Sequence, residues 1–314
     1  MTTLVDCQNC GAELSGRYCS ACGQKGDVGI PSLGRLLGDA LGDLYDFDSR
    51  LWRSLATLAF KPGVLTNLYL AGQRTRFTPP FRMYVITSVV FFVLFSLLRP
   101  ASAPPEAGSA TDDSATEAGA APAAAPDVEP GAADEGVLTG LSITVDDDDL
   151  ECTFNSESVS PALRERLEAA CERVEENGPA SFQRAFIDNV PVMMLVFIPI
   201  AAAIMKLLYL FAGRQYVEHV LFFAHVHTLF FLLATVTMLL GASMRIAWVP
   251  DWPVRGAIAA VWAYFLVYLY LAMRRVYDQR HALTAVKYVV LGGSYVLALV
   301  LTLLVTIVVT AFTL

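Results

Sequence analysis

The chain has 314 residues, of which 55% are hydrophobic and only 17% are charged, and its formal net charge is −8 at pH 7. Soluble domains carry about 25% charged residues, so this composition excludes an ordinary water-soluble protein and indicates a membrane protein. The negative charge is concentrated in residues 99–188, which contain 20 acidic and 5 basic residues, whereas the rest of the chain is net positive.

Two Cys-X-X-Cys motifs come first along the chain. Cys7 and Cys10 are followed, after eight residues, by Cys19 and Cys22, and a glycine follows each pair. Each motif presents two thiolates and four thiolates complete a closed tetrahedral site, so the spacing predicts a cytoplasmic four-cysteine zinc ribbon over residues 1–30. The zinc is expected to be structural, because a closed site of four thiolates has no open position for water. Free or redox-active cysteines are the alternative.

Residues 31–80 are predicted to form amphipathic helices that lead to the membrane. Their apolar residues recur at helical spacing, and Asp48 is the expected N-cap of the second helix. The expected helices cover residues 33–44, 48–60 and 64–71. Basic residues precede an apolar segment here, so we expect these helices to lie at the lipid headgroup layer. Packing on the bundle is the alternative.

Five apolar segments are long enough to cross a membrane, since about 20 helical residues span a ~30 Å hydrocarbon core. They cover residues 81–98, 190–211, 217–244, 254–273 and 284–313. Arg82 and Arg99 lie at the ends of the first segment, where their side chains can extend to the headgroups.

Lysine and arginine residues near the ends of the spans predict the orientation of the chain. Those assigned to the cytoplasmic side are Lys61, Arg74, Arg76, Arg82, Lys206, Arg214, Arg274, Arg275, Arg280 and Lys287. Only Arg245 and Arg255 flank the opposite loop. The N-terminus is therefore expected in the cytoplasm, with residues 99–188 and the C-terminus on the external or periplasmic side.

The exported segment divides into a linker and a small domain. Residues 99–136 are rich in Ala, Pro and acidic residues and predict a disordered acidic linker. Residues 137–188 predict a small α+β external domain, with strands at 141–145 and 150–154 and a helix from Pro161 that ends at Asn177-Gly178.

Cys152 and Cys171 are predicted to form a disulfide within this domain. Side chains two apart share a strand face, so Cys152 lies with Leu150 and Phe154, and Cys171 lies at the edge of the apolar stripe of the helix. The predicted external side is oxidising, and a domain of about 50 residues needs such a crosslink.

The third span carries most of the ionisable groups of the membrane region. Glu218, His219, His225 and His227 fall on this helix, and their spacing places them on two faces rather than in one chelating cluster. Three interpretations remain open: imidazoles hydrogen-bonded across helices, a proton or ion pathway, or a metal or haem site.

Tyrosine and tryptophan residues cluster near the predicted span ends, and most are expected to form interfacial belts. These residues are Tyr209, Tyr216, Tyr264, Tyr268, Tyr270, Tyr277, Trp248 and Trp252.

Three stretches resemble an uncharacterised bacterial family of membrane proteins with an N-terminal zinc ribbon, domain-of-unknown-function family 3667. They are CQNCGAELSGRYCSACGQK, DFDSRLWRSLATLAFKPGVLTNLYLAGQRTRFTPPFRMY and YVEHVLFFAHVHTLFF. The likeness is densest over residues 7–98 and 216–231. It implies a membrane location and zinc binding through Cys7, Cys10, Cys19 and Cys22, and it implies no activity. We expect that membrane to be the inner membrane of a bacterium.

The resulting expectation is an all-α membrane protein, a five-helix transmembrane bundle with a small zinc ribbon and a small external domain. No nucleophile–base set or phosphate loop indicates an enzyme. We expect a membrane-anchored adaptor, assembly or regulatory factor that binds a protein partner through the ribbon and interfacial helices. Alternatives are a small transporter or channel in which His225 and His227 line the pathway, and a membrane metalloprotein that uses the same histidines.

Other partners are less clearly indicated. The ribbon holds only Arg17 and Lys25 as basic groups, which is a weak nucleic-acid signal. A homo-oligomer is compatible with the sequence.

Overall fold

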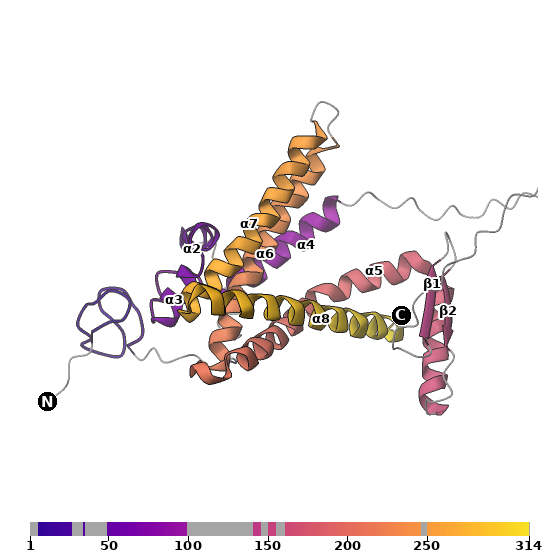
Figure 1. The fold of residues 1–314 in the computed structure, drawn as a ribbon, viewed down its shortest axis with the longest axis horizontal. Helices are drawn as coiled ribbons and strands as arrows, with labels where there is room; N and C mark the ends of the chain where they lie inside the picture. Colours follow the sequence, from indigo (N-terminus) through magenta and orange to yellow (C-terminus); the bar gives the residue numbers. More distant parts are fainter. Residues whose placement is uncertain are drawn as a thin grey trace, which may run out of the picture. The chain divides into compact units, whose positions relative to one another are not determined.

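In a computed structural model of the chain, the described residues are 6–26, 34, 49–98, 141–145, 150–154, 161–245 and 250–313 (Figure 1). The predicted helix at 33–44, its neighbour Asp48 and the predicted linker at 99–136 lie outside this range, apart from Gly34. The chain divides into two compact units, one of Met1–Leu98 with Arg184–Thr310 and one of Arg99–Gln183 with Ala311–Leu314. Each unit is described by itself below.

The described part of the chain is mostly helical, with one two-stranded sheet. The helices are α2 (Ser49–Phe60), α3 (Val64–Leu70), α4 (Pro80–Leu98), α5 (Pro161–Leu208), α6 (Tyr216–Ser243), α7 (Asp251–Tyr277) and α8 (His281–Thr313), with the short 3₁₀ helix η1 (Leu210–Ala212). The strands are β1 (Leu141–Val145) and β2 (Leu150–Phe154).

Five of these helices are long and apolar enough to cross a membrane, which confirms the predicted number of spans for the described residues. The candidate spans are Pro80–Leu98, Ser181–Leu208, Tyr216–Ser243, Asp251–Tyr277 and His281–Thr313. The protein is therefore a membrane protein by the length and composition of its helices.

Helix α6 is the most buried of the five candidate spans. It packs against α4 and α7, and the three run side by side in Figure 1. Its aromatic residues Phe222, Phe223 and Phe231 are almost fully buried. By contrast, α7 and α8 expose many apolar side chains, as expected for helices that face lipid rather than water.

Helices α2 and α3 are joined by a tight glycine turn that lies close to α7. Gly63 has a φ of 70°, and a Cβ atom there would lie 2.9 Å from the carbonyl oxygen of Ala272. Glycine allows both the left-handed conformation and this close approach. The predicted break at Lys61-Pro62-Gly63 and the predicted end of α3 at Gly72, which has a φ of 88°, are both confirmed.

The antiparallel pair β1 and β2 occurs at the two predicted strands, and Cys152 on β2 is paired with Ile143 on β1. The side chains of both strands, and that of Cys171, lie outside the described part of the structure. The Cys152–Cys171 disulfide and the compact external domain therefore remain predictions.

Two expectations are wrong. Helix α5 does not end at Asn177-Gly178 but continues to Leu208, so one helix joins the predicted external segment to the second span. Arg82 is only 9% exposed and is buried in the protein instead of extending to the headgroups, whereas Arg99 lies outside the described residues.

The expected aromatic belt does not include three of its eight candidate residues. Tyr209, Tyr268 and Tyr277 are buried within the protein and do not face the lipid interface. Tyr209 and Tyr277 stack on each other with ring centroids 4.1 Å apart. These three rings pack between helices, because nearness to a span end does not fix which way a ring faces. Trp252 is 80% exposed, as a belt residue should be, and Trp248 lies outside the described residues.

Candidate metal centre

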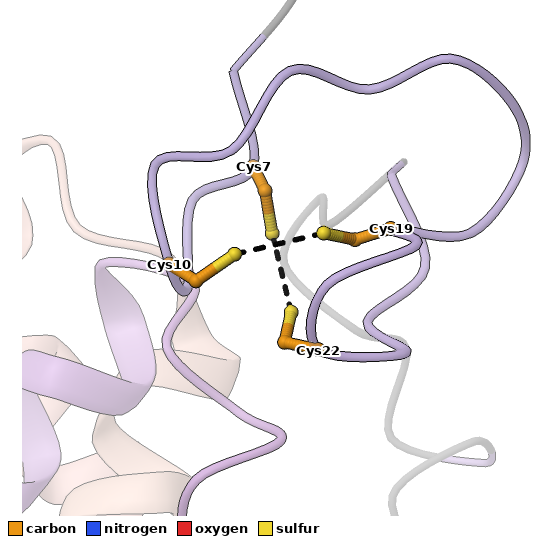
Figure 2. Close-up of side chains that lie close together, drawn as sticks. All are labelled: Cys7, Cys10, Cys19 and Cys22. Carbon is orange, nitrogen blue, oxygen red and sulfur yellow. Dashed lines mark hydrogen bonds between the residues drawn. The ribbon is translucent and has the colours of Figure 1, made fainter.

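The four N-terminal cysteines converge on one point, as Figure 2 shows. Their Sγ atoms all lie within 4.8 Å of one another. The Sγ atoms of Cys7 and Cys22 are 3.6 Å apart, and so are those of Cys10 and Cys19. A tetrahedral site with metal–sulfur bonds of about 2.3 Å has sulfur–sulfur distances of about 3.8 Å, so this arrangement fits a four-coordinate metal ion.

The two motifs are built in the same way. In each, the glycine that follows the motif closes the turn with a hydrogen bond to the first cysteine. Gly11 N–H donates to the Cys7 carbonyl oxygen and Gly23 N–H to the Cys19 carbonyl oxygen, both at 2.8 Å. Gly11 and Gly23 have φ values of 76° and 73°, as expected for the glycine after each motif. The sequence thus specifies the site locally, one turn at a time.

The thiols differ in acidity. A hydrogen bond from the Asn9 side chain, followed by one from the Gln24 backbone, lowers the pKa of Cys22 to about 6. A backbone hydrogen bond at Ala12 lowers the pKa of Cys10, but hydrogen bonds with the other sulfurs and desolvation raise it more, to about 12. Cys22 is therefore the more acidic of these two thiols, and metal binding by cysteine releases thiol protons.

Gln24 joins this centre to the helices. It is 5% exposed, and its Nε2 donates a 2.8 Å hydrogen bond to the carbonyl oxygen of Gly72. Its Oε1 accepts from the backbone N–H of Arg74, from the N–H of Thr75 and from the Thr75 hydroxyl, at 3.2, 3.3 and 3.0 Å. One buried side chain therefore holds the four-cysteine module, residues 6–26, against the turn between α3 and α4.

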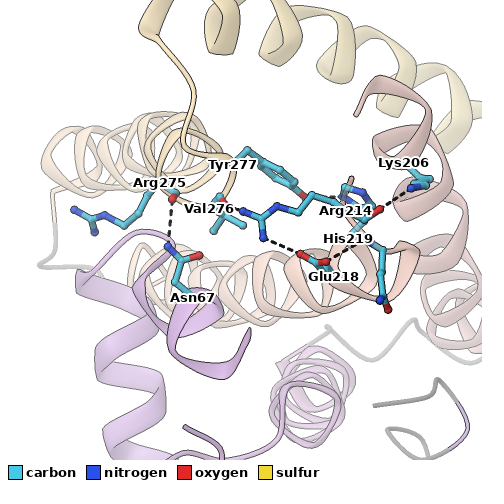
Figure 3. A network of polar contacts seen from close by, with 9 residues as sticks. Asn67, Lys206, Arg214, Glu218, His219, Arg275, Val276 and Tyr277 are labelled. Carbon is cyan, nitrogen blue, oxygen red and sulfur yellow. Dashed lines mark hydrogen bonds and ion pairs between the residues drawn. The ribbon is translucent and has the colours of Figure 1, made fainter. Parts of the chain in front are cut away.

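A second group of residues makes polar contacts where the ends of several helices meet (Figure 3). We call it the helix-end cluster; it consists of Asn67, Lys206, Arg214, Glu218, His219, Arg275, Val276 and Tyr277. Asn67 donates to the carbonyl oxygen of Arg275 at 3.2 Å, and Arg214 donates to that of Val276 at 3.2 Å. These bonds satisfy carbonyl groups that the C-terminus of α7 would otherwise leave unpaired.

Glu218 caps the start of α6. It accepts from the N–H of Gln215 at 3.0 Å and forms an ion pair with Arg214 at 2.9 Å. Both interactions give this carboxylate a structural role, and Lys206 adds a 2.5 Å hydrogen bond to the carbonyl oxygen of Arg214. The cluster brings together three segments that are predicted to lie on one side of the membrane.

The histidines of α6 have separate partners on separate helices. Nδ1 of His219 lies 2.7 Å from the Tyr277 hydroxyl on α7, and Nδ1 of His225 lies 3.0 Å from the Thr66 hydroxyl on α3. His227 bonds the carbonyl oxygen of Phe223 at 2.8 Å through Nδ1, and the Tyr295 hydroxyl at 3.2 Å through Nε2. Within the described residues, the only group of metal-ligating side chains within reach of a single ion is that of the four cysteines.

Sequence reasoning misses two features of these sites. Nothing in the sequence marks Gln24, although its place two residues after Cys22 puts it at the edge of the turn. The sequence also gives no sign that Tyr277 and Tyr295 are the partners of His219 and His227, because both tyrosines are distant from α6 along the chain.

The fold and the cysteine site together define a multi-span helical membrane protein whose four N-terminal cysteines lie close enough to hold one metal ion. A family model described as "Protein of unknown function (DUF3667)" matches residues 48–92, which supports membership of that family. The match covers α2, α3 and the first part of α4. It is shorter than the family resemblance noted over residues 7–98 and 216–231, and it does not include the four cysteines. No match to a curated protein or to a solved structure was found.

Proposed function

We propose that the protein is a membrane-anchored adaptor that presents a zinc-stabilised module to a protein partner at the cytoplasmic membrane surface. The observation that supports this most directly is the contact of Gln24 with the turn at 72–75. Four hydrogen bonds from one buried side chain fix the module on the membrane-proximal helices. A module that is fixed in this way presents one surface in a defined orientation.

The surface that stays exposed has the character of a binding site. Tyr18 is 58% exposed and lies beside the exposed Arg17 on the module. Tyrosine and arginine are enriched among the residues that contribute most binding energy in protein–protein interfaces. Tyr18 also pairs with Lys25 in an isolated β-bridge, so its backbone is held in place.

Zinc is the metal that this donor set favours. Four thiolates at tetrahedral spacing are typical of structural zinc sites. All four coordination positions would be filled by the chain, so the ion would stabilise the fold of the module and would not activate water.

The proposed orientation places the metal centre in the cytoplasm of a bacterial cell. The helix-end cluster supports the predicted topology, in which successive loops lie on opposite sides of the membrane. Arg214 and Asn67 both contact the end of α7, and all three segments are predicted to lie on the cytoplasmic side. At another loop, Arg245 donates to the carbonyl oxygen of Leu98 at 3.2 Å, which joins two segments that are both predicted to lie outside. The larger number of lysine and arginine residues at the helix-end cluster favours that end as cytoplasmic.

A transport function is the second candidate. It is favoured by one observation: the Nε2 atoms of His219 and His225 are buried without a hydrogen-bond partner among the described residues. Such atoms are costly in a membrane unless water or an ion reaches them. Proton uptake by proteoliposomes that is lost in His225→Gln would favour this function over the adaptor.

A photocrosslinking experiment tests the adaptor proposal. The full-length protein would carry p-benzoylphenylalanine in place of Tyr18 and be irradiated in intact cells. We expect one discrete protein adduct, which Cys10→Ser should abolish because the module loses its metal and its fold. If only lipid or no adducts form, or if the same adduct forms when Cys10 is replaced, then the proposal is wrong.

A further inference from the structure

A cavity of about 350 Å³ lies at the C-terminal end of α7 and includes none of the metal-centre residues. Its volume falls within the ~300–1,000 Å³ range of small-molecule sites. The residues that line it are Pro62, Leu271, Arg274, Arg275, Asp278 and Gln279. Neither the adaptor function nor the helix-end cluster requires a cavity here.

The lining combines two kinds of polar group. Arg274 and Arg275 supply guanidinium donors. Nη1 of Arg275 donates a 2.8 Å hydrogen bond to the carbonyl oxygen of Pro62, which holds that side chain in place. Asp278 and Gln279 supply acceptors, and the Oε1 atom of Gln279 is buried without a hydrogen-bond partner among the described residues. A buried acceptor of this kind is costly unless a donor reaches it.

The position of the cavity in the membrane follows from the surface of α7. Leu266 and Val267 are 57% and 56% exposed, and Leu271 on the cavity wall is 40% exposed. Within one more turn the sequence changes to Arg274 and Arg275. A change from exposed apolar to cationic residues at the end of a span marks the level of the lipid headgroups, on whichever side this end lies.

We propose that this cavity binds the headgroup of an aminophospholipid, with its phosphodiester on Arg274 and Arg275 and its primary ammonium on Asp278 and Gln279. The lining has two cations and one anion, which matches a phosphate next to an ammonium. Guanidinium groups bind phosphate through charge-assisted hydrogen bonds, and an ammonium has three N–H donors for the two acceptors.

Other phosphate-containing ligands fit less well. A phosphatidylglycerol headgroup has no cation to pair with the Asp278 carboxylate, and its negatively charged phosphate would lie near that carboxylate. A choline headgroup has no N–H donor for the orphan oxygen of Gln279. A free phosphate ester shares the phosphate chemistry but supplies neither the amine nor the acyl chains that would lie along the exposed surface at Leu271.

The test uses full-length protein that has been delipidated in detergent and titrated with phosphatidylethanolamine, phosphatidylglycerol or phosphatidylcholine of identical acyl chains. Native mass spectrometry measures the bound lipid, and inorganic phosphate serves as a competitor. We expect about tenfold tighter binding of phosphatidylethanolamine than of the other two lipids, since each charge-assisted hydrogen bond is worth roughly a factor of ten.

Two variants and one control assign the effect to the cavity. Arg274→Gln should weaken phosphatidylethanolamine binding about tenfold, and Asp278→Asn should abolish its preference over phosphatidylglycerol. Arg280→Gln removes the same charge at a residue outside the lining and should change nothing. Equal binding of the three lipids, an equal effect of Arg280→Gln, or displacement by millimolar inorganic phosphate would overturn the proposal; the last would indicate a free-phosphate site. Unchanged thermal unfolding of each variant keeps the comparison valid.

Discussion

Replacing Gln24 with Ala should release the four-cysteine module from the helices without emptying the metal centre. The side chain makes four hydrogen bonds, to the carbonyl of Gly72, the N–H groups of Arg74 and Thr75, and the Thr75 hydroxyl. A net contribution of about 0.5–1.5 kcal/mol per hydrogen bond gives roughly 2–4 kcal/mol, because three of the bonds share one acceptor. The docking equilibrium should therefore shift by roughly 30- to 1,000-fold toward the released state.

Amide hydrogen exchange measures this release at the groups concerned. In the full-length protein the backbone amides of Arg74 and Thr75 should exchange much faster in Gln24→Ala than in the wild type, while the metal content stays the same. Ser20→Ala alters an exposed residue of the same module and should leave both quantities unchanged. Protection of the two amides that is equal in Gln24→Ala and wild type would refute the docking argument.

Three further predictions follow from packing and chemistry. Gly63→Ala should destabilise the protein by about 1–3 kcal/mol, because its φ is 70° and α7 is too close for a Cβ atom; an unchanged thermal unfolding midpoint would contradict this. Replacing both His225 and His227 with Gln should lower stability and remove no metal, whereas loss of a second bound metal in elemental analysis would show a site in α6. Cys152 and Cys171 should resist a membrane-impermeant thiol reagent in unreduced cells, and full labelling of both would exclude the disulfide.

The features that could be predicted from the sequence are those that local spacing determines. The Cys-X-X-Cys pairs and their glycines specify two turns, and the turns bring four sulfurs together. The spans follow from apolar length alone, and Lys61-Pro62-Gly63 ends α2 because proline and glycine cannot continue a helix there.

Contacts between distant segments could not be predicted in the same way. The spacing of His219 and His227 gives the angle between them on α6, but it does not give Tyr277 or Tyr295 as their partners. Gln24 is a polar residue in no motif, and its role depends on a turn that begins 48 residues later.

The error in α5 has a different origin. Asn177-Gly178 is a common helix end, yet a glycine inside a helix costs only about 1 kcal/mol relative to alanine. The helical segments on both sides are long enough to outweigh that cost, so α5 continues through both residues. Pro179 follows directly and costs more in a helix interior than the glycine does, so the long helical segments around this site override the stop signal, not strong helix formers next to it.

The zinc content of the purified full-length protein tests the central claim most directly. Elemental analysis of protein expressed in zinc-replete cells should find one zinc ion per chain, and Cys10→Ser should contain none. The matched control is Cys152→Ser, which removes a cysteine outside the metal centre and should keep the full zinc content. Wild-type protein without zinc, or zinc that persists in Cys10→Ser, would contradict a four-cysteine zinc centre at the N-terminus.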